Sequence, residues 1–181
     1  MSSPATNLSP KSARPAATEH APYYGRYTAL VPDGPITATL RAQAAETARL
    51  LASAPAAKEE HRYADGKWSV KEVVGHMIDA ERVFAYRALR FARADATPLA
   101  GFDENIYVPA GAFGARTLKS LAEEFRVVRE STIQLLEGMP DEAMSRGGVA
   151  SENPVTVRAL AWIIAGHERH HVGILRERYG L

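Results

Sequence analysis

The placement of proline limits what this chain can fold into. Six of its eleven prolines fall within the first 35 residues, and the other five are isolated. Proline lacks a backbone donor and breaks helices and central strands, so regular structure must lie between these positions. Four long segments without an internal proline carry the periodicity of amphipathic helices, at about 36–54, 69–94, 117–138 and 156–179.

Local signals mark where these predicted helices begin. Ser69 followed by Glu72 matches the capping-box pattern, and Thr117 and Thr156 stand where N-caps are expected. No segment shows a comparable period-2 alternation. We therefore predict an all-α four-helix bundle with a long loop, 94–116, between the second and third helices.

Length and composition divide the chain into a tail and one domain. The 181 residues suit a single hydrophobic core, and 46% hydrophobic with 24% charged residues is typical of a globular protein. The first 20 residues are rich in Pro, Ser, Thr and Ala and bury too little apolar surface to offset their ordering entropy. We predict a disordered tail at 1–20 and the bundle domain at 21–181.

Charge and cysteine content argue against several classes of protein. The formal net charge is only +1, so the attraction on which non-specific nucleic-acid binding depends is missing. The absence of cysteine excludes disulfides, thiolate zinc sites and cysteine nucleophiles. No run reaches the roughly 18 apolar residues of a membrane span, and the N-terminus lacks the apolar stretch of a secretory signal. We expect a cytoplasmic protein without a nucleic-acid or membrane partner.

Two histidines stand at the centre of the apolar stripe of the fourth predicted helix. At about 100° per residue, His167 and His171 fall roughly 20° either side of the buried direction. Histidines at i and i+4 project from one face and form a natural chelating pair. A buried imidazole should be neutral, so its lone pair needs a donor or a cation. Hydrogen-bonded core histidines are the alternative explanation.

A third ligand is expected from another helix. His20 lies in the predicted tail and His61 in a loop, whereas His76 lies at the edge of the apolar arc of the second helix. Three histidines from two helices leave coordination positions open, as in catalytic sites. We predict a divalent-metal site at His76, His167 and His171, with zinc or nickel first and iron or manganese as alternatives.

Other residues near these stripes are weaker candidates. Glu72, Glu81 and Arg87 could orient a ligand or hold an anionic substrate, although salt bridges explain each of them equally well. Glu81 falls inside the apolar arc, so it should be paired if it is buried. Gly75 and Gly166 each precede a candidate ligand inside a helix, where close packing or a bound group would offset the cost of glycine.

The segment His167-Glu-Arg-His-His171 also matches the H-E-x-x-H pattern of zinc peptidases, in which the glutamate is the general base. Glu168, however, projects about 80° from the core direction, and only ten residues follow the motif in the printed sequence. We do not favour a peptidase.

With these residues in place, the sequence resembles the DinB-like superfamily of metal-binding four-helix bundles, and most closely its DinB_2 subfamily. The similarity spans about residues 20–181. It is carried by segments that include Trp68-Ser-Val-Lys-Glu-Val-Val-Gly-His76, Asp79-Ala-Glu-Arg82, Gly101-Phe-Asp-Glu104 and Ala161-Trp-Ile-Ile-Ala-Gly-His-Glu-Arg-His-His171.

The resemblance implies a bundle that holds a divalent metal at the positions of His76, His167 and His171, and that is frequently a dimer. Characterised relatives include transferases and isomerases that use low-molecular-weight thiols such as bacillithiol and mycothiol. We therefore expect a metal-dependent enzyme acting on small molecules, a thiol-dependent S-transferase or a hydrolase, with a role in stress or detoxification. The alternative is a non-catalytic metal- or ligand-binding bundle with a regulatory or structural role.

Overall fold

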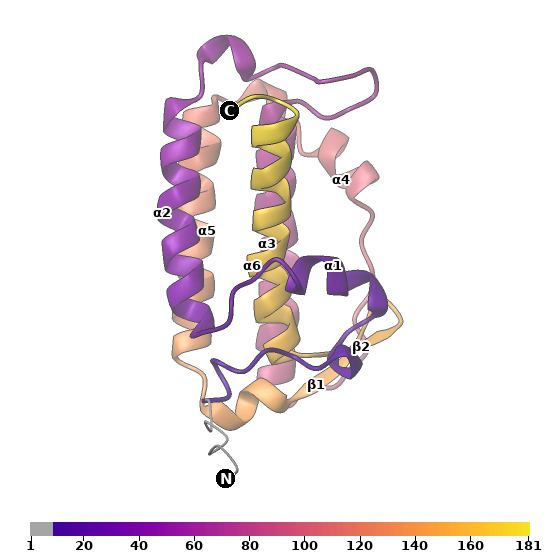
Figure 1. The fold of residues 1–181 in the computed structure, drawn as a ribbon. Helices are drawn as coiled ribbons and strands as arrows, with labels where there is room; N and C mark the ends of the chain where they lie inside the picture. The colour runs from indigo at the N-terminus through magenta and orange to yellow at the C-terminus, as the bar shows by residue number, and fades with distance from the viewer. Residues whose placement is uncertain (1–8) are drawn as a thin grey trace.

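The computed structural model describes residues 9–181. Two short helices, α1 (Gly25–Thr28) and α4 (Glu104–Ala110), lie outside a bundle of four long ones (Figure 1). The predicted four-helix bundle is confirmed, and each long helix begins and ends within two residues of its predicted position. The four long helices are α2 (Ile36–Ser53), α3 (Val70–Ala92), α5 (Leu118–Glu137) and α6 (Val157–Glu177).

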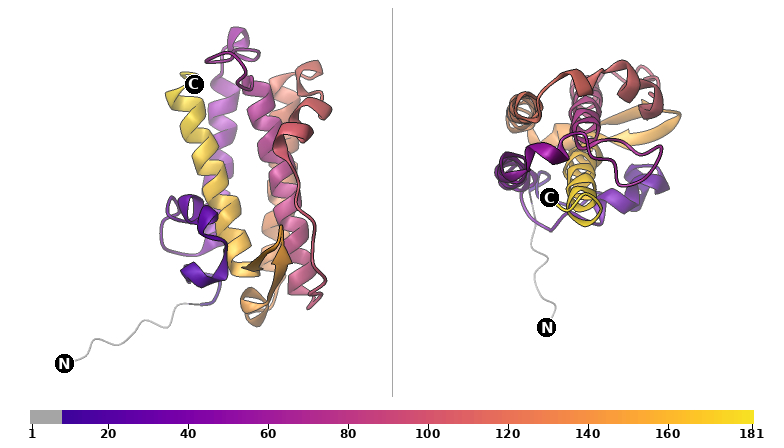
Figure 2. Two further views of the ribbon diagram at one scale, coloured as in Figure 1. Left: turned by 90° about the vertical axis from the view of Figure 1, so that its right-hand side faces the viewer. Right: turned by 90° about the horizontal axis from the view of Figure 1, so that it is seen from above.

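The helices are arranged so that α3 lies between α5 and α6, and α2 contacts the same two helices from the other side (Figure 2). Helices α2 and α6 run in one direction, and α3 and α5 run in the opposite one (Figure 1). The C-terminal end of α6 therefore meets the start of α3, where the Tyr179 hydroxyl donates to the Trp68 carbonyl. This antiparallel contact places the histidine-bearing faces of α3 and α6 opposite each other.

Side chains cap the helices where the sequence predicts. The Ser69 hydroxyl accepts from the Glu72 backbone N–H, and the Glu72 carboxylate accepts from the Ser69 N–H at 2.7 Å. The hydroxyls of Thr117 and Thr156 accept backbone N–H groups at the starts of α5 and α6. These bonds satisfy donors that the first helical turn leaves free.

A small hairpin was not predicted. Strands β1 (Gly147–Ala150) and β2 (Asn153–Thr156) pair antiparallel before α6, and Leu99 bridges to Ala150. The expected long loop at 94–116 is present but contains α4. Four-residue strands are too short to show a clear alternating pattern in a sequence, which is why the hairpin was not predicted.

Residues 9–20 correct the prediction of a disordered tail; residues 1–8 lie outside the described part. The Arg14 guanidinium donates to the carbonyls of Thr28 and Val31. Glu19 accepts from Arg158, with a shortest distance of 2.8 Å, and from the Thr156 hydroxyl. Polar bonds from Arg14 and Glu19, together with the buried Pro15, hold this segment on the bundle, and its composition alone did not show these contacts.

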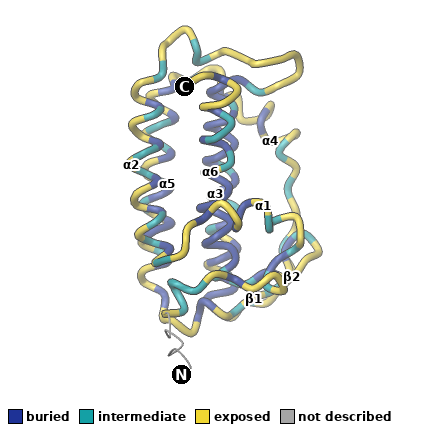
Figure 3. The backbone as a smooth tube through the Cα atoms, viewed as in Figure 1, coloured by how far each residue is buried: buried dark blue, intermediate teal, exposed yellow. Residues whose placement is uncertain are grey.

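The buried side of each long helix faces the others (Figure 3). Most of this core is apolar, including the fully buried Trp162 of α6. Its middle, however, holds buried histidines and an ion-paired group of charged side chains. Among the described residues, no helix combines the length and apolarity needed to cross a membrane.

Candidate metal centre

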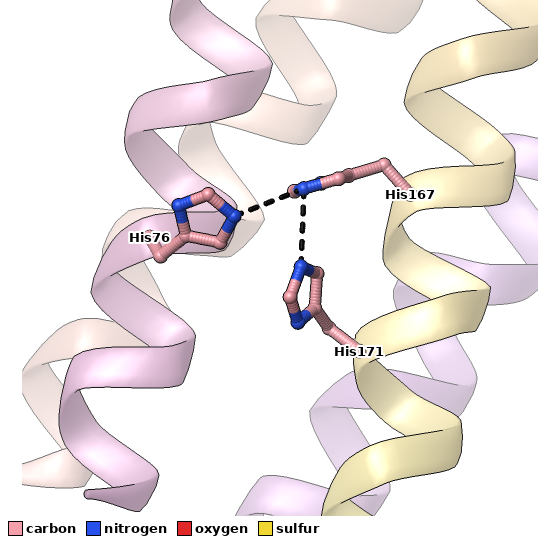
Figure 4. A group of neighbouring side chains, drawn as sticks. All are labelled: His76, His167 and His171. Carbon is pink, nitrogen blue, oxygen red and sulfur yellow. Dashed lines mark hydrogen bonds between the residues drawn. The ribbon is translucent and has the colours of Figure 1, made fainter. Parts of the chain in front are cut away.

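Three histidines meet between α3 and α6, as Figure 4 shows. The Nε2 atom of His167 lies 3.0 Å from Nε2 of His76 and 3.1 Å from Nε2 of His171. Each residue is at most 8% exposed. The structure therefore brings the three predicted ligands together and turns one nitrogen of each ring toward a common point.

Local sequence explains how the rings reach this point. His167 and His171 are one turn apart on α6, and His76 projects from the antiparallel helix α3. Next to them, Gly75 and Gly166 permit close packing. A Cβ at Gly75 would lie 2.3 Å from the Phe113 ring, and one at Gly166 would lie 2.1 Å from the Tyr27 carbonyl oxygen.

Burial keeps these histidines uncharged. It lowers the pKa of His76 to about 4, and it holds the pKa values of His167 and His171 well below the usual range, with further lowering by the neighbouring rings. A neutral imidazole offers a nitrogen lone pair, which is the form that binds a metal ion. The candidate ligand atoms also all lie within 4.8 Å of one another. The residues present thus fit a divalent metal.

Two cavities flank the three histidines. One of about 100 Å³ is lined by His76 and His167 together with Tyr23, Tyr24, Tyr27, Phe84, Phe102, Glu104 and Ser151. The other, of about 270 Å³, is lined by His171 together with Tyr63, Gly66, Lys67, Trp68, Val73, Asn105, Ile174 and Tyr179. Small molecules could therefore reach the histidines from two sides.

A buried ion network adjoins His167 and supports α6 from the side of α2 and α5. Arg129 of α5 donates to both oxygens of Glu81 at 2.8 Å and pairs with Glu168, whose other oxygen accepts from Thr47. Burial opposes the charge on Arg129, but the two carboxylates outweigh it and raise its pKa. The expectation that buried Glu81 is paired is confirmed.

Glu168 is more buried than its projection suggested, because α2 and α5 cover that side of α6. Its bonds to Arg129 and Thr47 engage it away from the ring nitrogens, so it is not placed as the general base of a peptidase. Arg129 was missed in the sequence. Its position four residues after Phe125 and three before Thr132 is the signal that could have placed it on the buried face.

The two remaining candidates differ in position. Glu72 caps α3 and pairs with Arg62 at 2.5 Å, so it has a structural role and does not face the histidines. Arg87 is buried beside the smaller cavity and donates to Ser151, one of its lining residues. Of the two, only Arg87 stays a candidate for contact with a substrate.

Sequence comparison now identifies the family. Residues 39–175 match the family model of the DinB superfamily. The chain belongs to the DinB superfamily. No curated protein sequence matches this member of the family.

A solved structure agrees with this assignment at the level of the fold. YfiT from Bacillus subtilis is described as "a probable metal-dependent hydrolase with an unusual four-helix bundle topology". This DinB-superfamily chain is similar to YfiT with a TM-score of 0.70 and 18% sequence identity. The match covers 80% of this chain and 86% of YfiT.

Proposed function

We propose that this protein is a metal-dependent enzyme that acts on small molecules and binds a divalent ion through His76, His167 and His171. The observation that carries the proposal is the convergence of three buried, neutral Nε2 atoms between two cavities. A histidine triad leaves coordination positions for a substrate or water. Zinc or nickel is the metal we test first, with iron and manganese next.

Thiol-dependent group transfer is the reaction we favour. A divalent ion bound there would stabilise a thiolate at neutral pH, whose sulfur could form a C–S bond with an electrophilic carbon while the leaving group departs with the electron pair of the broken bond. The protein's own contribution is to exclude water around the sulfur and to hold two reactants. The separate cavities at His171 and at the His76–His167 pair support two reactants better than one.

Hydrolysis is the second candidate, and the description of YfiT is the observation that favours it. It needs only one organic substrate and a metal-bound water. A non-catalytic bundle is the third candidate, for which a closed site without adjoining cavities would be expected; the two cavities weigh against it. A cytoplasmic location, a homodimer and a role in stress or detoxification stay predictions.

Metal analysis tests the site first. Purified untagged protein should hold about one equivalent of a divalent metal, which His167→Ala should lose. The control is His61→Ala, because His61 is exposed and lies outside the site. If neither the isolated nor the metal-incubated wild-type protein binds zinc, nickel, iron or manganese, the proposed site is wrong.

Activity is then assigned with two assays on the loaded protein. A thiol and an electrophile are incubated together and the thioether is quantified by mass spectrometry, while ester and amide substrates are tested for hydrolysis without thiol. Transfer that His167→Ala abolishes and His61→Ala preserves supports the favoured reaction. Hydrolysis alone would replace it with the second candidate, and inactivity in both assays would favour the third.

A further inference from the structure

Arg87 differs from the other buried cations of the described chain. Three such side chains are at most 6% exposed: Lys71, Arg87 and Arg129. Lys71 pairs with Glu60, and Arg129 pairs with two glutamates. Arg87 is 3% exposed and has no carboxylate within ion-pair distance among residues 9–181. The guanidinium lies 5.9 Å from the Phe84 and Phe102 rings, neither of which carries a full counter-charge. Because a buried charge is costly without a counter-charge, an anionic ligand would be favoured beside Arg87.

The contacts of Arg87 direct it toward the smaller cavity. Its Nη2 atom donates to the Ser151 hydroxyl and to the Ala100 carbonyl, both at 2.9 Å. The guanidinium lies 5.9 Å from the Phe84 ring, which the Tyr24 ring meets edge-on at 6.1 Å, and its charge opposes the rise that burial causes in the pKa of Tyr24. Ser151 and Tyr24 both line the cavity that reaches His76 and His167.

The turn between β1 and β2 places Ser151 in the wall of the smaller cavity. Ser151 and Glu152 have φ values of 51° and 65°, the left-handed region that non-glycine residues rarely adopt. The turn conformation brings the Ser151 hydroxyl to Arg87. Since this hydroxyl accepts from the guanidinium, its own proton remains available to another acceptor.

We propose that Arg87, acting with the hydroxyls of Ser151 and Tyr24, binds a carboxylate group of the substrate in the smaller cavity. The cavity of about 100 Å³ limits this group to a small acid, and the opposite wall presents His76 and His167. Glu104 also lines the cavity, and its negative charge repels an anion and so lowers the affinity for the carboxylate. The inference rests on the proposed function, because it assigns the substrate class of the same site.

Two probes of nearly the same size and shape, one with a carboxylate and one with a neutral amide, test the subsite. The affinities of 3-mercaptopropionate and its neutral amide, 3-mercaptopropionamide, are measured by NMR titration of the metal-free and the zinc-loaded protein. Charge-assisted hydrogen bonds should favour the acid over the amide by about tenfold in both forms. Arg87→Met should abolish the preference, and Glu104→Gln should raise it by about two- to threefold, as for one partly exposed charge.

Matched variants separate recognition from folding. Arg82→Met removes an exposed arginine from the same helix and should keep the preference. If Arg87→Met does not fold, the Ser151→Ala/Tyr24→Phe double variant tests the same contacts and should lower the preference at least threefold. Equal affinities for acid and amide in the wild type, or an unchanged preference in the variant that folds, would overturn the subsite.

Absorption spectra of the cobalt-loaded protein distinguish failure of the carboxylate subsite from failure of the proposed thiol chemistry. Sulfur binding to the metal gives a thiolate-to-cobalt absorption band with either probe. A band with equal affinities would leave the thiol chemistry intact and overturn the carboxylate subsite. A preference for the acid without a band would overturn the thiol chemistry and support the subsite.

Discussion

Arg129 on α5 forms an ion pair with Glu168, the residue that follows His167 on α6. Arg129 and Glu168 are only 1% and 2% exposed. The carboxylate of Glu168 and the ring of His167 leave α6 in different directions, one toward α5 and α2 and the other toward α3. The rotation of α6, and with it the direction of the histidines, is therefore fixed from both sides.

Removing the arginine should be costly. Arg129→Met leaves two buried carboxylates without a counter-charge, so the free energy of unfolding should fall by about 3–5 kcal/mol in urea titrations. Arg126→Met on the same helix removes an exposed pair with Glu123, and because solvent screens that pair the loss of stability should be far smaller. Equal losses in both variants would show that the buried network does not stabilise the bundle.

Two glycines of α6 should respond in opposite ways to alanine. Gly166→Ala places a methyl group against the Tyr27 backbone, so α1 must move and stability should fall by about 1–3 kcal/mol. At Gly173 nothing lies within 4 Å of the added carbon, so Gly173→Ala should be neutral or stabilise by up to about 1 kcal/mol through helix propensity. Thermal unfolding of both variants measures the difference, and a loss at Gly173 would instead reveal a covered surface.

The metal-free protein should lose stability as the pH falls from about 6.5 toward 4. Unfolded histidine takes up its proton near pH 6.5, whereas burial lowers the pKa of folded His76 to about 4. The unfolded state therefore binds more protons in this range, and the free energy of unfolding decreases. For His76 the full loss is about 3 kcal/mol.

Variants show whether the histidine cluster causes this dependence. Urea titrations at pH 7 and pH 5 should give a smaller difference for His76→Gln than for the wild type. The exposed His61 provides the control, and His61→Gln should keep the wild-type difference. A wild-type slope in His76→Gln would mean that other groups dominate the acid response.

Metal binding should stabilise the fold, because the three ligands come together only in the native state. Free metal at about one hundred times its Kd should add about 2.7 kcal/mol to the free energy of unfolding, and a chelator should remove it. Calorimetry should detect this increment in the wild type and not in His167→Ala. A similar increment in both proteins would place the metal elsewhere.

The long helices were predictable because each signal acts within one turn. The capping bonds of Ser69, Thr117 and Thr156 depend on residues three positions away, and the prolines act on their own backbone. The pairing of His167 with His171 follows from helix geometry for the same reason. Interactions within one helical turn therefore suffice to predict the four long helices and the pairing of two of the three candidate ligands.

Long-range contacts account for what was missed. His76 was expected at the edge of its apolar arc, yet it is 7% exposed because α6 and Trp68 cover it. From the sequence alone Arg129 would be placed on the surface, because its two ion-pair partners, Glu81 and Glu168, belong to other helices. The segment at 9–20 is likewise held by partners as distant in sequence as Arg158.

The separation of 91 residues between His76 and His167 has a consequence for biosynthesis. At about 5–20 residues per second, the ribosome needs roughly 5–20 seconds to reach His167 after it has made His76. During that interval α3 exists without the helix that covers its histidine. If the three histidines bind an ion as proposed, the complete site forms only after α6 has been synthesised. Metal binding through all three rings would then come too late to guide the early collapse of the nascent chain.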